Sequence, residues 1–104
     1  MKRPYLRKLY TMGELTIWLV DGRWVREHLF MDFTQGGHDI VYDWIPKNQV
    51  WIDDDLSADE RPFVIEHELY ERDKMKKGMG YERAHGYANV VEKALRLKAG
   101  GKKK

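Results

Sequence analysis

Hydrophobic and polar positions divide the chain into a first half of short apolar runs and a second half with helical spacing. Residues 15–20 (LTIWLV) are apolar, β-branched or aromatic, and Asp21-Gly22 directly after them is a strong turn signal. We therefore expect a strand that ends at Val20. Residues 23–33 fit neither the period of a strand nor that of a helix, so both interpretations stay open.

Two further apolar segments predict a pair of strands. Residues 38–44 (HDIVYDW) and 49–53 (QVWID) combine β-branched and aromatic side chains, and a loop at 34–37 precedes the first of them. The connection at 45–48 contains a proline and an asparagine, which are typical turn residues. The two segments are expected to pair as a hairpin or near-hairpin.

The second half begins with signals for a helix start. Ser57 and Glu60 have the spacing of a capping box, and Pro62 is compatible only with the first turn of a helix. This combination favours Asp59 as the residue that caps the helix. The helix is expected to run to about Met75.

A second helix is predicted over residues 81–98, after two glycines in the segment 76–80 that supply capping and turn conformations. Its helical period places one stripe of residues on a common face: Tyr81, His85, Ala88, Glu92 and Leu95. Strands followed by helices indicate an α+β fold, with a small antiparallel sheet of about three to four strands packed against two C-terminal helices. We expect one domain over residues 1–98.

Composition limits the chemistry that the domain can perform. Hydrophobic residues make up 42% of the chain and aromatic residues 12%, which suffices for a compact core. The absence of cysteine excludes disulfides, thiolate zinc sites and a cysteine nucleophile, so a metal ion would need His, Asp or Glu ligands. No apolar run approaches the roughly 18 residues that span a bilayer, and we expect a cytoplasmic protein without membrane association.

The net charge of +2 is unevenly distributed. Residues 9–92 contain nine basic and seventeen acidic side chains and therefore carry −8, whereas both ends of the chain are basic. An acidic body argues against nucleic-acid binding. The segment 99–104 (AGGKKK) is expected to be a disordered basic tail.

The predicted first helix contains a group of ionisable residues within an otherwise core-like sequence, FVIEHELYER. His67 and Glu71 are four residues apart, so their side chains project about 40° apart and one turn along, which suits two ligands of one metal ion. Glu68 points about 100° away from His67 and is placed to reach a water molecule at such an ion. The same residues also fit a solvated helix face with Glu–Arg pairs.

The predicted second helix offers a third ligand, His85. If the two helices are antiparallel, residues that face each other are equidistant from the connection between them. The midpoints of the pairs 67/85 and 71/85 both fall within residues 76–78, so His85 is expected level with the gap between His67 and Glu71. Two histidines and one carboxylate with an open fourth position form the ligand set of a catalytic zinc site.

These residues resemble the zincin-like metallopeptidases. The pattern His67-Glu68-x-x-Glu71 followed by His85 is similar to their His-Glu-x-x-His motif with a downstream carboxylate, with the two ligand types exchanged. The segments EHELYE and GYERAHGYA are also similar to uncharacterised phage and prokaryotic proteins, and the resemblance covers roughly residues 40–97. It implies one Zn²⁺ ion, or another divalent metal, bound by His67, Glu71 and His85, with Glu68 as the general base.

The resemblance also implies roles for further residues. Gln49, Val50, Trp51 and Ile52 would form an edge strand onto which an extended peptide substrate adds. His38 or Tyr42 could donate a hydrogen bond to the oxyanion, although an ordinary polar position is the favoured interpretation of His38. Glu92 would orient a ligand histidine or act as a substitute ligand.

Three functional hypotheses follow. The first is a zinc-dependent peptidase or related amide hydrolase that acts on a peptide or protein substrate. The second is a non-catalytic zincin-like interaction module with a structural or vestigial metal site. The third, a nucleic-acid adaptor that uses the basic ends, conflicts with the charge of −8 on the body.

Overall fold

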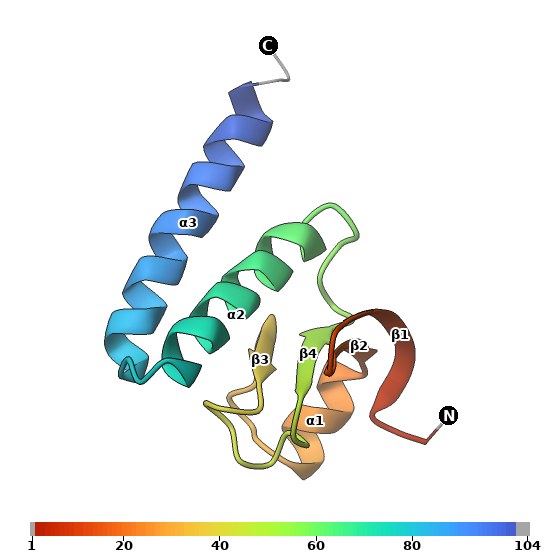
Figure 1. Cartoon of the computed structure of the whole chain (residues 1–104). Helices are drawn as coiled ribbons and strands as arrows, with labels where there is room; N and C mark the ends of the chain where they lie inside the picture. The colour runs from red at the N-terminus through yellow and green to blue at the C-terminus, as the bar shows by residue number, and fades with distance from the viewer. Residues whose placement is uncertain (1, 102–104) are drawn as a thin grey trace.

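The computed structural model describes residues 2–101 and contains one four-stranded sheet and three helices in that part of the chain (Figure 1). The strand order is β1-β2-β4-β3. This confirms the predicted α+β class with two C-terminal helices. The elements are β1 (Tyr5–Met12), β2 (Leu15–Val20), α1 (Gly22–His28), β3 (Gly36–His38), β4 (Gln49–Asp53), α2 (Arg61–Lys76) and α3 (Tyr81–Gly101).

β1 and β2 form a hairpin in which Met12 pairs with Leu15 across a two-residue connection. Gly13 opens this connection with a φ of +59°, a left-handed conformation that glycine adopts without steric cost. No strand was predicted for residues 5–12, because β1 is an edge strand whose side chains are exposed or half-buried. Its hydrophobic pattern is correspondingly weak.

The first part of the segment 23–33, whose pattern fitted neither a strand nor a helix, belongs to helix α1, which ends at His28. The Asp21 side chain accepts a hydrogen bond from the Trp24 backbone N–H at 3.0 Å and so caps the helix instead of forming a hairpin turn. After α1 the chain returns to the sheet, and β4 lies parallel to β2. The prediction of an antiparallel sheet is therefore wrong, since the sheet is mixed.

The predicted strand at 38–44 is also mostly wrong. β3 covers only Gly36–His38, and the following residues form turns in which the His38 carbonyl accepts from the Tyr42 N–H at 3.1 Å. Tyr42 and Trp44 stack on each other with ring centroids 4.9 Å apart. These aromatic residues produced a strand-like pattern, but they pack in a loop. The predicted pairing of this region with the next strand is confirmed for β3 and β4.

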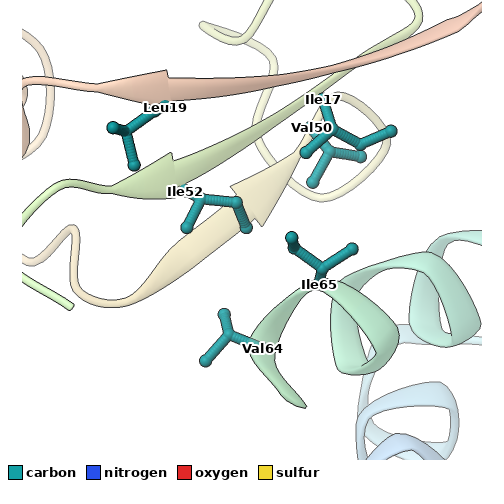
Figure 2. Close-up of a cluster of buried hydrophobic side chains, with 6 residues drawn as sticks. All are labelled: Ile17, Leu19, Val50, Ile52, Val64 and Ile65. Atoms are coloured by element: carbon teal, nitrogen blue, oxygen red, sulfur yellow. The ribbon is translucent and has the colours of Figure 1, made fainter. Parts of the chain in front are cut away.

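β2 and β4 bury side chains on both faces of the sheet, as expected for strands in parallel pairing. Alternate residues of both strands meet α2 in one core cluster, shown in Figure 2: Ile17, Leu19, Val50, Ile52, Val64 and Ile65. The opposite face packs against α1 and the loops through a second cluster: Val20, Val25, Phe33, Ile45 and Trp51. These contacts hold α2 in a defined position against the sheet.

The two C-terminal helices lie side by side, with α2 between β3 and α3 (Figure 1). α2 begins at Arg61, so the residue in the capping position is Glu60, and the predicted cap at Asp59 is wrong. The Glu60 side chain makes no capping hydrogen bond. α3 continues to Gly101, three residues beyond the predicted end, so it includes residues 99–101, which were assigned to the tail. Residues 102–104 of the predicted tail lie outside the described residues. None of the helices within 2–101 is both long and apolar enough to cross a membrane.

Candidate metal centre

His67, Glu68 and Glu71 lie on the side of α2 that faces the rest of the protein. Val64 and Ile65 anchor the first turns to the sheet, and the helical period carries the same face forward to His67, Glu68 and Glu71. All three residues are buried, with exposures of 6%, 8% and 2%. Buried ionisable groups are costly unless they are paired or bind a ligand, so this group requires partners.

The partner on α3 is His85, as the midpoint count predicted. Its Nδ1 donates to Glu71 Oε2 at 2.7 Å and lies 3.3 Å from His67 Nε2. His67 Nε2 is in turn 3.3 Å from Glu71 Oε2. Three potential ligand atoms from three residues therefore converge on one point.

The spacing of these atoms fits a small divalent ion. A tetrahedral ion with bonds of 2.0–2.2 Å separates its ligand atoms by about 3.4 Å. Two of the three separations are 3.3 Å, and the third, 2.7 Å, is a hydrogen bond that must lengthen when an ion replaces the proton. The His85 side chain is 42% exposed, so the point of convergence is accessible from solvent.

His38, at the end of β3, contacts Glu71 from the other side. Its ring is fully buried, and its Nε2 donates to Glu71 Oε1 at 2.9 Å. Its Nδ1 accepts from the backbone N–H groups of Ile40 and Val41, both at 3.3 Å. Both ring nitrogens are therefore engaged, and the predicted role of His38 as an oxyanion donor is wrong because its N–H group is already donated to Glu71.

Glu92 lies on the far side of His67 from the convergent atoms. Its Oε1 is 2.9 Å from His67 Nδ1, although the ring N–H is not aligned for a hydrogen bond, and its Oε2 accepts from Arg96 Nε at 2.8 Å. Arg96 also pairs with Glu60 at 2.8 Å, which ties α3 to the start of α2. Two roles were considered for Glu92, orientation of a ligand histidine and direct binding of the metal ion. Its position beside His67 Nδ1 favours the first.

The three convergent residues open into a cavity of about 340 Å³. One wall is formed by residues 34–36, before and at the start of β3, and the opposite wall by α3. Tyr42 and Tyr81 line the cavity, and the Tyr81 ring stacks on His85 with centroids 5.3 Å apart. Tyr42 thus remains available as a hydrogen-bond donor to a bound molecule. Tyr81, predicted to lie on the same helical stripe as His85, had no predicted role in the site.

The charges of the site shift several pKa values. Burial raises the pKa of Glu71, but hydrogen bonds from His38, His67 and His85 more than offset this effect and hold it at about 2. Burial, reinforced by the negative charge of Glu71, raises the pKa of Glu68 to about 8. Burial lowers the pKa of His67, yet the hydrogen bond to Glu71 and the nearby carboxylates raise it overall. Two neighbouring carboxyl groups are therefore held in different protonation states, a feature typical of functional sites.

The buried Glu68 predicts a pH-dependent stability in the metal-free protein. Because its pKa of about 8 exceeds the ordinary value of 4.5, its contribution to stability is complete below pH 4.5 and is lost as pH rises towards 8. We expect Glu68→Gln to increase the free energy of unfolding at pH 7 by about 2–3 kcal/mol and to remove this slope. Urea unfolding between pH 5 and 9 measures both effects, with Glu66→Gln, at an exposed position on α2, as control. Equal stabilities of Glu68→Gln and wild type at pH 7 would contradict the prediction.

The strand that was predicted to bind the substrate does not lie at an edge of the sheet. Gln49, Val50, Trp51 and Ile52 belong to β4, which is paired on both sides by β2 and β3. The prediction of an edge strand there is wrong, because the crossover through α1 placed β2 next to β4. The free edge next to the cavity belongs to β3, whose Gly36 lines the cavity wall.

Comparison with protein-family models, with curated proteins and with solved structures found no match. A function for this protein is therefore inferred from the geometry of the site itself.

Proposed function

We propose that this protein is a cytoplasmic, zincin-like metal-dependent hydrolase of peptide or amide bonds. His67, Glu71 and His85 would hold one divalent ion, and Glu68 would act as general base. The observation that carries the proposal is the convergence of three ligand atoms within 3.3 Å of one another, beside a buried carboxyl group and at the wall of a cavity.

The residues around the cavity suit hydrolysis. When bound, a divalent ion supplies Lewis acidity towards a carbonyl group and lowers the pKa of a water molecule. Glu68 would accept the proton of the attacking water once the charge of a bound cation had lowered its pKa from about 8 and left its carboxylate ionised. The Tyr42 hydroxyl would donate a hydrogen bond to the developing oxyanion.

The edge of β3 supports a peptide as the substrate. Among residues 2–101, β3 pairs only with β4, so no other strand of this part of the chain occupies its second edge. An extended peptide that adds to this edge would run past Gly36, which lines the same cavity as Glu68 and His85. We therefore move the proposed substrate strand from β4 to β3.

The donor set does not by itself select zinc. Two imidazoles and one carboxylate also suit iron(II) and manganese(II). Metal titration should therefore include Zn²⁺, Fe²⁺ and Mn²⁺, followed by hydrolysis of a peptide library with each loaded protein.

Metal affinity of the wild type and of His85→Ala tests the proposal. We expect one ion per wild-type chain, a higher melting temperature with metal, and peptide hydrolysis. His85→Ala should lose more affinity than the roughly 10- to 100-fold that follows loss of a hydrogen bond to a ligand. His28→Ala, at an exposed position on α1, is the matched control. Full metal occupancy without hydrolysis of any peptide would instead support the non-catalytic module, and absence of metal binding would exclude both functions.

A further inference from the structure

Two overlapping groups of potential ligands share Glu71. His67, Glu71 and His85 form one group, and His38, Glu68 and Glu71 form the other, with ligand atoms within 4.8 Å of one another in each. The two oxygens of Glu71 face different groups, since Oε2 is near His85 and Oε1 is near His38. Such an arrangement is compatible with a pair of metal ions, which lie roughly 3.5–4 Å apart in two-metal hydrolases. The hydrogen bonds of His38 indicate whether these residues can bind one metal ion or two.

The backbone determines which nitrogen of His38 carries the proton. The N–H groups of Ile40 and Val41 both point at Nδ1 from 3.3 Å, and an N–H group can donate only to a nitrogen with a free lone pair. In the neutral ring the proton is therefore on Nε2, which donates it to Glu71 Oε1 at 2.9 Å. A nitrogen that carries a proton has no lone pair in the ring plane for a metal ion. His38 consequently faces Glu71 as a hydrogen-bond donor and not as a ligand.

We propose that His38 is the positioning residue of a single-ion centre: its Nε2–H occupies Glu71 Oε1, so that Glu71 presents only Oε2 to the ion held with His67 and His85. This inference rests on the proposed function, because it assumes that these three residues bind metal. It assigns His38 a role different from both of those considered from the sequence. It also excludes the group of His38, Glu68 and Glu71 as a second metal site.

Two features of the surroundings of His38 stabilise its hydrogen bond to Glu71. The ring is fully buried, so water cannot replace Glu71 as its partner. The next residue, Asp39, forms a two-pronged ion pair with Arg72, the residue after Glu71, at 2.6 and 3.2 Å. The consecutive residues His38 and Asp39 are thus bound by the consecutive residues Glu71 and Arg72 of α2. This double connection fixes both the distance and the orientation between His38 and Glu71.

Binding of an ion through a single oxygen of Glu71 would have a chemical consequence. A carboxylate that binds through both oxygens would fill two coordination positions of an ion, and one that binds through a single oxygen would fill one. By engaging Oε1, the hydrogen bond from His38 would leave a coordination position of a bound ion open. Glu68 remains free to act as a base, because no second ion competes for its carboxylate.

The proton of His38 can be observed directly by ¹⁵N NMR of its ring. We expect the Nε2–H tautomer in the metal-free protein and in the Zn²⁺-loaded protein, and one Zn²⁺ ion per chain even in excess metal. Loss of the Nε2 proton on Zn²⁺ binding, or a second bound ion, would overturn the inference. These measurements use the unaltered chain and do not depend on catalytic activity.

Two substitutions of His38 test the hydrogen bond. His38→Gln places an amide N–H near the position of Nε2, whereas His38→Met has a similar size and no donor. We expect Zn²⁺ affinity to fall about 10- to 100-fold in His38→Met and to recover largely in His38→Gln. With Co²⁺ as probe, His38→Met should show the weaker visible absorption of a five-coordinate ion, because the released Oε1 joins the ion. His28→Met, at an exposed position on α1, controls for the substitution itself.

The outcomes separate the inference from the proposed function. Absence of Zn²⁺ binding by the wild type would overturn the proposed function and this inference together. One bound ion with equal affinity in wild type, His38→Met and His38→Gln would overturn the inference alone. If His38→Met does not fold, as judged by circular dichroism, the NMR tautomer and the stoichiometry of the wild type decide the question.

Discussion

We expect Glu68→Gln to lower the rate of peptide hydrolysis by about 10²- to 10⁴-fold, the usual contribution of a general base. Zinc affinity should change little, because the convergent ligand atoms belong to His67, Glu71 and His85. Glutamine has the shape of glutamate but cannot accept the proton of an attacking water. Hydrolysis rates and zinc titrations of the same protein samples measure both quantities.

The matched control is Glu66→Gln, which makes the same change at an exposed position on the same helix. It should retain the wild-type rate and the wild-type zinc affinity. Retention of full activity in Glu68→Gln would exclude Glu68 as the base. Loss of zinc together with activity would instead identify Glu68 as a ligand.

We expect Arg72→Met to lower the free energy of unfolding by about 3 kcal/mol, as is usual when one partner of a buried ion pair is removed. Arg72 Nε and Nη2 donate to the two oxygens of Asp39, and both side chains are at most 10% exposed. Burial raises the pKa of Asp39, but the Arg72 hydrogen bond and the Asn48 N–H at 2.8 Å lower it overall. The pair therefore stabilises the fold at neutral pH, and this contribution is lost as pH falls through the folded-state pKa.

Urea unfolding at pH 7 measures this effect, with Arg23→Met as control. Arg23 pairs with Glu27 on the surface of α1, where its side chain is 84% exposed, and its loss should change stability by at most about 0.5 kcal/mol. Adding Asp39→Asn to Arg72→Met should recover part of the loss, because it removes the unpaired buried charge. A double variant less stable than Arg72→Met would contradict this explanation.

The sequence predicted the two helices and their most important side chains because these depend on local rules. Capping signals and the glycines near residue 78 placed the helices to within a few residues of their observed bounds. A short connection between helices makes them antiparallel, so counting residues was enough to bring His85 level with His67 and Glu71. Zinc binding and hydrolysis by this group stay predictions.

The sheet could not be predicted in the same way. Whether residues 23–33 formed a strand or a helix decided whether β4 would be an edge strand or lie beside β2, and the local pattern was ambiguous. Tyr42 and Trp44 have strand-like character, yet they stack in a loop where aromatic contacts replace sheet pairing. Strand order depends on contacts between distant segments, which no short window of sequence contains.

By itself, then, the sequence determined the helical pair and the set of His67, Glu68, Glu71 and His85, since helical period and a short turn are local properties. Only the tertiary structure decided that β3 is the free edge beside the cavity and that His38 holds Glu71. His38 and Glu71 are 33 residues apart and belong to different elements. Their hydrogen bond forms because the buried faces of β4 and α2 pack together and bring β3 against the middle of α2.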